Sequence, residues 1–238
     1  ILPITVSIPD VIDICYVEFD TLTNKNKVFW SSMESNSTDS AFVYREQSLG
    51  VWVKIGSVVF SNGDFTDTLS NPMNQSYNYS ISAFDTCGFE GELSSNHKTI
   101  TLIKSYDQLS NTYGFSWSAY EGLSVPEYNV YGVEANGTAT IIGTVPGNNY
   151  MYNYTNPSPS YLNYFVGFDA PACGAKTNHT VRSNYVSAVA TSIEDYSCVP
   201  IELYPNPVNE ELTIDANDNI EPISFRILNA VGQEIYNG

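Results

Sequence analysis

Bulky side chains alternate with small or polar ones along short stretches of the chain, for example at Val28 and Trp30 and from Tyr77 to Ala83. A period of two places such side chains on one face of a strand, so the pattern predicts β-strands with one buried face. Turn residues such as Asn62 and Gly63 separate these stretches. No stretch has the spacing of an amphipathic helix, and we therefore expect almost no helix.

The pattern of strands and turns occurs twice along the chain. Matching residues lie 87 positions apart (117 − 30), and the pairs are Trp30 with Trp117, Tyr44 with Tyr131, and Gly56 with Gly143. Further on, the segment from Tyr77 to Gly88 resembles the segment from Tyr161 to Gly174. Several matches keep nearly one spacing, which indicates a tandem duplication of a unit of about ninety residues.

Each unit has room for about seven short strands, the number found in an immunoglobulin-like sandwich. The units resemble fibronectin type III-like domains. The resemblance implies that Trp30 and Trp117 lie in the core and that Tyr77 occupies the tyrosine-corner position. Its counterpart in the second unit is Tyr161, and the strand that follows departs from the apolar pattern at Asn163.

These observations predict an all-β chain built from two tandem sandwiches and a small C-terminal β domain. We expect the first sandwich at residues 11–102 and the second at 103–192. Residues 1–10, which contain two prolines, are interpreted as an incoming linker strand, and 193–199 as a second linker.

Residues 200–238 differ in kind from the repeats. Two prolines around an asparagine fix a turn, and alternating strands follow. The segment resembles the C-terminal sorting domain of proteins exported by the type IX secretion system of Bacteroidota, which implies contact with that machinery and release or anchoring outside the cell. Such tails run on through another strand pair and a basic end, so this one is expected to be truncated. The residues that carry the resemblance are Tyr204, Pro205, Asn206, Pro207, Leu212, Ile214 and Gly232.

The charge of the chain narrows the classes of partner. Its 238 residues include 9 Lys+Arg and 26 Asp+Glu, which gives a net charge of −17. Such a surface repels phosphate backbones and anionic lipids, so nucleic-acid binding and membrane docking are excluded. The sequence has no apolar run long enough for a membrane helix and no initiating Met, and we interpret it as a mature form or a fragment.

Four cysteines, Cys15, Cys87, Cys173 and Cys198, lack the C-x-x-C spacing of zinc or redox sites. Their even number favours an oxidising compartment and two disulfides, and buried free thiols are the alternative. Leu102 stands where the second unit should repeat Cys15. We therefore expect the bonds Cys15–Cys87 and Cys173–Cys198.

We expect no catalytic site, metal site or cofactor. His97 and His179 belong to different units and to no nucleophile motif, so loop or interdomain packing is their expected role. Carboxylate pairs for glycoside hydrolysis are available among so many acids, but small sandwiches lack a deep cleft. Asp64 with Asp67, and Asp215 with Asp218, lack the spacing of a calcium loop and are interpreted as solvated turn acids.

A tyrosine stripe is the main candidate for ligand binding. Tyr150, Tyr152 and Tyr154 share one face if their segment is a strand, and nearby asparagines could bind sugar hydroxyls. The alternative is that this face is buried and that Met151 and Asn153 point outward. The leading hypothesis is a non-catalytic spacer or binding segment ahead of an export tail. A carbohydrate-binding or adhesin module and the ancillary part of a larger secreted hydrolase stay open, with a glycan or surface protein as the partner.

Overall fold

The computed structural model describes residues 8–32, 38–174 and 177–188, together with four short strands near the C-terminus. The chain divides into two compact units, Ile1–Val189 and Ala190–Gly238. Within the described residues, the only helical element is a single 3-10 turn, η1 (Phe60–Asn62). The predicted all-β fold is confirmed.

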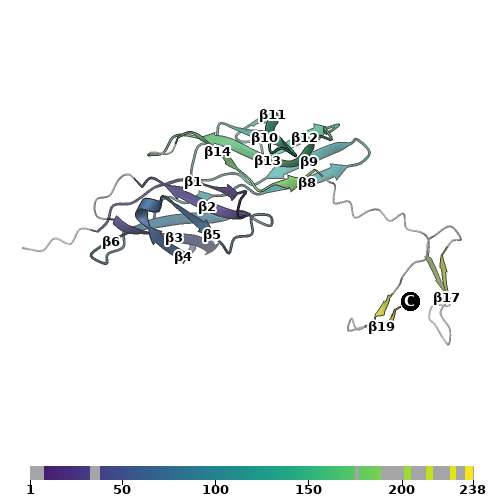
Figure 1. Ribbon diagram of the computed structural model, residues 1–238, viewed down its shortest axis with the longest axis horizontal. Helices are drawn as coiled ribbons and strands as arrows, with labels where there is room; N and C mark the ends of the chain where they lie inside the picture. Colours follow the sequence, from purple (N-terminus) through teal and green to yellow (C-terminus); the bar gives the residue numbers. More distant parts are fainter. Residues whose placement is uncertain are drawn as a thin grey trace, which may run out of the picture. The chain divides into compact units, whose positions relative to one another are not determined.

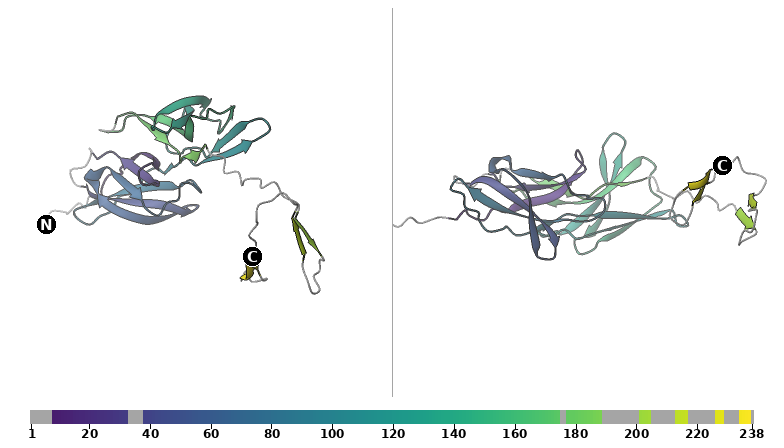
Figure 2. Two further views of the ribbon diagram at one scale, coloured as in Figure 1. Left: turned by 45° about the vertical axis from the view of Figure 1, so that its right-hand side comes forward. Right: turned by 90° about the horizontal axis from the view of Figure 1, so that it is seen from below.

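The first repeat is a sandwich of two antiparallel sheets (Figures 1 and 2). One sheet has the order β1-β2-β5 and the other the order β4-β3-β6-β7. Its strands are β1 (Ile14–Asp20), β2 (Lys25–Trp30), β3 (Thr38–Ser48), β4 (Val51–Val59), β5 (Asp64–Asp67), β6 (Asn78–Asp85) and β7 (His97–Lys98). Three strands facing four is the arrangement of a fibronectin type III-like domain.

The second repeat has the same strand order in its two sheets, β12-β9-β8 and β11-β10-β13-β14, and β15 pairs with β13 as well. Its strands are β8 (Leu102–Asp107), β9 (Thr112–Trp117), β10 (Glu127–Glu134), β11 (Ala139–Pro146), β12 (Met151–Thr155), β13 (Tyr161–Ala170), β14 (His179–Arg182) and β15 (Val186–Ser187). The internal duplication inferred from the sequence is therefore a duplication of one sandwich. The exact domain boundaries given above stay a prediction.

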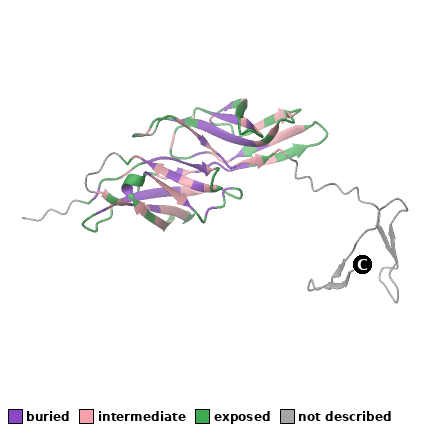
Figure 3. Ribbon diagram, viewed as in Figure 1, coloured by how far each residue is buried: buried purple, intermediate pink, exposed green. Residues whose placement is uncertain are grey.

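The two tryptophans are core residues of equivalent strands, as expected. Trp30 in β2 is fully buried and Trp117 in β9 is 6% exposed. Figure 3 shows the buried residues along the strands of both repeats. Removing apolar side chains of this size from water is the main source of stability for such a sandwich.

A β-bulge recurs at the same place in both repeats and explains the repeated Ile-Gly sequence. The β3–β4 register skips Ile55, and the β10–β11 register skips Ile142. The glycine that follows each bulge, Gly56 or Gly143, leaves room for an aromatic ring: a Cβ there would collide with Phe65 or Tyr152. Those rings also lie 87 positions apart (152 − 65), so bulge, glycine and ring form one repeated unit.

The tyrosine corner predicted at Tyr77 is present in the first repeat. The Asn71 N–H donates to the hydroxyl of Tyr77 at 3.0 Å. In the second repeat, Tyr161 was predicted to be the counterpart of Tyr77, and this assignment was wrong by one residue. Val43 pairs with Ile81 and Val130 pairs with Val166, so positions in β6 and β13 differ by 85 rather than 84.

This register correction accounts for Asn163. With the spacing of 85, Asn163 matches Asn78 of the first repeat, and both precede a fully buried tyrosine, Tyr79 or Tyr164. One residue of slip moves a side chain to the other face of a strand. Asn163 therefore does not interrupt the buried face, because the apolar residues of that face are its neighbours.

Near the C-terminus, two antiparallel pairs of strands are described. β16 (Ile201–Tyr204) pairs with β17 (Thr213–Ala216), and β18 (Arg226–Leu228) pairs with β19 (Glu234–Asn237). The alternating stretches of the tail sequence thus form strands.

Candidate functional site at the junction of the repeats

A disulfide joins the two repeats. Cys15 bonds to Cys173, with a Cα–Cα distance of 5.6 Å across 158 residues of sequence. The predicted bonds Cys15–Cys87 and Cys173–Cys198 were therefore wrong. Among the described residues Cys87 is exposed and has no disulfide partner, and Cys198 lies outside them.

The reason for this pairing is a second kind of bulge. Ile14 pairs with Trp30 and Tyr16 pairs with Phe29, so Cys15 is the extra residue between them. A bulge leaves its extra residue out of the ladder and turns its side chain in a new direction. Cys15 is thereby available to the second repeat.

The outer side of β1 is covered by β14 of the second repeat, and the two strands lie side by side in Figure 1. The ring of His179 stacks on Tyr16 at 4.9 Å with an interplanar angle of 15°. His179 Nε2 lies 2.8 Å from Glu18 Oε1. Tyr16 and Glu18 are both buried, and burial raises the pKa of Tyr16 to about 12.

A second set of contacts joins the loop after β9 to two strands of the first repeat, β1 and β7. The backbone N–H of Val17 donates to the hydroxyl oxygen of Tyr120 at 3.0 Å, and that oxygen lies 2.9 Å from His97 Nδ1. Because the tyrosine oxygen already accepts one hydrogen bond, its own O–H is free to donate to a neutral His97. Burial lowers the pKa of His97 to about 4, which keeps the ring neutral.

The loop after β9 adds to this junction. Lys98 and Glu121 form a backbone bridge in both directions and an ion pair of 2.9 Å. Gly122 has a φ of +105°, and a Cβ there would collide with the ring of His97. The expectation that His97 and His179 have interdomain packing roles is confirmed.

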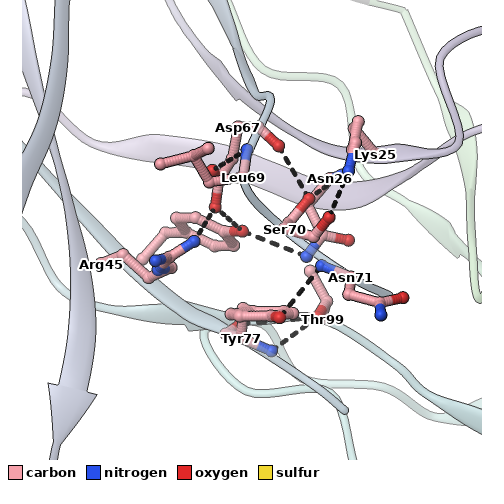
Figure 4. A network of polar contacts seen from close by, with 10 residues as sticks. Lys25, Asn26, Arg45, Asp67, Leu69, Ser70, Asn71, Tyr77 and Thr99 are labelled. Carbon is pink, nitrogen blue, oxygen red and sulfur yellow. Dashed lines mark hydrogen bonds and ion pairs between the residues drawn. The ribbon is translucent and has the colours of Figure 1, made fainter. Parts of the chain in front are cut away.

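A network of polar contacts lies at one end of the first sandwich (Figure 4). The buried carboxylate of Asp67 accepts from Arg45 Nη1 and from the Tyr79 hydroxyl, both at 2.8 Å. It also accepts from the Leu69 N–H at 3.1 Å. Asn26 donates to the Tyr79 hydroxyl at 3.1 Å, so the network reaches β2. Each contact to Asp67 satisfies a charge that burial would otherwise make costly.

Beside this network is a polar recess of about 300 Å³. Its lining has side chains of both charges, five uncharged polar residues and one aromatic ring. We refer to it as the Tyr77 recess, and its residues are Arg45, Glu46, Gln47, Ser48, Leu49, Gln75, Ser76, Tyr77, Asn78 and Lys98. The guanidinium of Arg45 lies over the Tyr77 ring at 5.2 Å. The two cations already have acidic partners in Asp67 and Glu121, so the recess suits a neutral polar ligand better than an anion.

The tyrosine stripe lies on the inner side of its strand. Tyr152 and Tyr154 of β12 pack against the core, and Met151 is 65% exposed. The Tyr152 hydroxyl donates to the Ile142 carbonyl at 2.6 Å, and the Tyr154 hydroxyl accepts from Ser158 N–H at 3.2 Å. Only Tyr150, at 37% exposed, reaches solvent to a substantial degree. This arrangement is the alternative given above, with the tyrosine face turned inward and Met151 and Asn153 pointing outward.

The acids considered for calcium have structural partners. Asp67 is buried in the network, so its interpretation as a solvated turn acid was wrong. Asp64 forms an ion pair with Lys27 at 3.3 Å. Within the part of the chain that the structure describes, no group of three or more His, Cys, Asp or Glu side chains could hold a metal ion. Asp218 lies outside that part, and Asp215 belongs to β17.

The sorting motif is described only in part. Tyr204 pairs with Thr213 and Leu203 with Ile214 in the β16–β17 ladder. The other residues of the motif, Pro205, Asn206, Pro207, Leu212 and Gly232, lie outside the described residues.

Sequence reasoning missed Tyr16 and Glu18 as interface residues. A signal was present in the sequence, since Ile14 to Phe19 is apolar at every position except Glu18, and the structure buries all six residues. A run buried on both faces needs a cover on each side, and the second repeat supplies one of them.

Comparison with known proteins finds a family match for one segment of the chain. Residues 202–238 match the family described as the secretion system C-terminal sorting domain. Among curated proteins, none is similar in sequence to the chain.

Three solved structures share a low identity with the chain. The FN1–FN3 domains of chicken CNTN1 are 15% identical over 77% of this chain and 66% of that one, with a TM-score of 0.27. A two-domain fibronectin type III segment of chicken tenascin is 15% identical over 74% and 94%, with a TM-score of 0.28. A tetra-tandem repeat from the extending region of a large adhesion protein is 15% identical over 74% and 48%, with a TM-score of 0.22. The fold assignment rests on the strand order given above.

No helix among the described residues has the length and apolar character to cross a membrane. The sorting match covers the same segment in which the Tyr-Pro-Asn-Pro sequence and the alternating strands occur. Residues 202–238 are a type IX secretion sorting domain, and the chain is a secreted protein that is released or held at the outer cell surface.

Proposed function

We propose that the two sandwiches act as a rigid, non-catalytic spacer and binding segment of a secreted protein. The observation that carries this proposal is the junction between the repeats. Tandem sandwiches that meet through a short linker alone change their relative orientation easily. Here a disulfide, a stacked ring pair and a hydrogen-bonded tyrosine restrain the orientation at separate points.

Spin-label distances test the rigidity of the segment. Leu49 and Leu109 are almost fully exposed and belong to different repeats, so labels attached there by a chemistry that does not use cysteine leave the disulfide intact. We expect a narrow distance distribution in the oxidised protein. The Cys15→Ser/Cys173→Ser variant should give a broader one. A broad distribution in the oxidised protein would contradict the spacer proposal.

A carbohydrate-binding role is the second candidate, and the Tyr77 recess is the observation that favours it. Its glutamines and serines offer donors and acceptors for hydroxyl groups, and such sites combine a few polar groups with an apolar surface. A glycan array compares the wild-type protein with Gln47→Ala/Gln75→Ala. Gln108→Ala, at an exposed turn of the second repeat, is the matched control. Binding that only the double variant loses would support this role.

A further inference from the structure

The loop after β13 is the part of the second repeat that docks on the first. Cys173 in this loop bonds to Cys15. A Cβ on the next residue, Gly174, would collide with Ser31 of the first repeat. At the start of β14, His179 stacks on Tyr16. We refer to Cys173, Gly174 and His179 as the docking loop.

The first repeat contains an equivalent loop after β6. Cys87 and Gly88 lie two and three residues after the end of this strand, and Cys173 and Gly174 lie three and four residues after the end of β13. Both glycines have a positive φ, 90° for Gly88 and 57° for Gly174. The backbone is therefore left-handed at the glycine that follows the cysteine in both loops.

The position of His179 also has a counterpart, and it is aromatic. His179 pairs with Ala170 at the end of β13. Phe89 occupies the same place beside the end of β6, because its carbonyl accepts from the N–H of Asp85 at 3.0 Å. The first repeat thus presents a ring where the second repeat has the ring that stacks on Tyr16.

In the first repeat the described residues leave much of this loop uncovered. Cys87 is exposed and has no disulfide partner there. A Cβ at Gly88 would meet no atom within 4 Å. Phe89 is 41% exposed and Leu93 is 39% exposed. An exposed thiol beside exposed apolar side chains is costly to leave uncovered in an oxidising compartment.

We propose that Cys87, Gly88 and Phe89 dock on a further sandwich of the same kind, on the N-terminal side of the first repeat. Cys87 forms a disulfide with a cysteine in the first strand of that sandwich, and Phe89 stacks on the aromatic residue that follows it. The direction comes from the observed junction, where the loop of the later repeat reaches the first strand of the earlier one. The inference rests on the proposed spacer function, which it extends to a longer clamped array.

The chain's own first strands do not fit as the partner in a second copy. In the first repeat, Cys15 is already bonded and Tyr16 is buried under the second repeat. In the second repeat, Leu102 and Ile103 pair with consecutive residues of β9, so this strand has neither the bulge nor a cysteine. For the same reason the second repeat ends the clamped array.

The covalent step joins two thiols as a disulfide and releases two protons and two electrons. The electrons pass by thiol–disulfide exchange to a disulfide oxidant, which becomes a dithiol.

Peptide mapping of the secreted full-length protein tests the proposal. Free thiols are alkylated in the native state, and the protein is digested and analysed without reduction. We expect Cys87 in a peptide linked to the first strand of a preceding sandwich, with little alkylated Cys87. The Cys15–Cys173 peptide in the same digest is the internal control.

Three results would overturn the proposal: alkylated Cys87, a Cys87–Cys198 bond, or a bond between two copies of Cys87. None of them would affect the rigidity of the two-repeat segment, which the spin-label distances test separately. Phe89→Ser supplies a second measurement, compared with Met73→Ser, since the two side chains are similarly exposed. The Phe89 change should increase the rate at which a reductant opens the Cys87 bond, and the Met73 change should not.

Discussion

Nδ1 of His97, in β7 of the first repeat, lies 2.9 Å from the hydroxyl of Tyr120, in the loop after β9 of the second repeat. Since Tyr120 accepts from Val17, the tyrosine donates to His97, and the histidine must be neutral to accept. A protonated His97 would present a second donor to the same oxygen. The junction between the repeats therefore depends on the protonation of one buried ring.

We predict that the free energy of unfolding falls as the pH drops below about 6.5. The pKa of His97 is about 4 in the folded protein and 6.5 in the unfolded chain. Between these values the unfolded chain binds more protons, so acid favours unfolding. The contribution of His97 lost between pH 7.5 and pH 5 is about 2 kcal/mol. Urea unfolding at the two pH values measures it.

The control for the pH prediction is His97→Asn, whose side-chain oxygen can accept the same hydrogen bond but does not titrate. Its loss of stability between pH 7.5 and pH 5 should be about 2 kcal/mol smaller than that of the wild-type protein. An equal loss in both proteins would show that other groups cause the acid sensitivity.

The disulfide between the repeats should contribute strongly to stability. In the chain-entropy account, closing a loop as long as the one between Cys15 and Cys173 stabilises by about 5 kcal/mol. We therefore expect Cys15→Ser/Cys173→Ser to unfold at a lower temperature in calorimetry. Cys87→Ser removes a cysteine that has no disulfide partner among the described residues. This change should leave the unfolding temperature of the chain nearly unchanged.

The amino-acid pattern predicts the sandwich architecture well because the strands have one buried face. The repeat and the resemblance to fibronectin type III-like domains together placed Trp30 and Trp117 in the core, where both are buried. The position of Asn163 could not, since a register depends on the partner strand and one residue of slip exchanges the faces. A local sequence does not contain that information.

The junction was harder to predict from sequence for a related reason. The bulge at Cys15 has no local sequence signal, yet it decides which sandwich the thiol faces. The disulfides predicted from the repeat assume that each sandwich contains both cysteines of its own bond. The structure instead uses Cys15 and Cys173 between sandwiches, and contacts between domains follow from surfaces that no single repeat defines.

The buried network of Asp67 should be sensitive to loss of its charge. Asp67→Asn leaves the part-buried guanidinium of Arg45 without a carboxylate, and breaking such a pair costs about 3–5 kcal/mol when the partner stays charged. We expect a large loss of stability in urea unfolding. Arg45→Met in the Asp67→Asn background should restore part of it, because the unpaired cation is then absent. No recovery would indicate that the hydrogen bond to Tyr79 matters more than the ion pair.

The bulge glycine of the second repeat should tolerate no side chain. A Cβ at Gly143 would overlap the ring of Tyr152, whose hydroxyl donates to the carbonyl of Ile142. Gly143→Ala therefore displaces the ring and breaks this hydrogen bond, at a cost of about 1–3 kcal/mol in chemical denaturation. Gly56→Ala in the first repeat should cost less, because its ring, Phe65, has no hydroxyl.

A double-mutant cycle isolates the contact between Gly143 and Tyr152. Tyr152→Ala removes the ring and leaves space at Gly143, so adding Gly143→Ala to this variant should change stability far less than it does in the wild-type protein. If Gly143→Ala costs the same in both backgrounds, the backbone of the bulge rather than the aromatic ring requires the glycine. The coupling energy thus decides whether the repeated bulge, glycine and ring act as one unit.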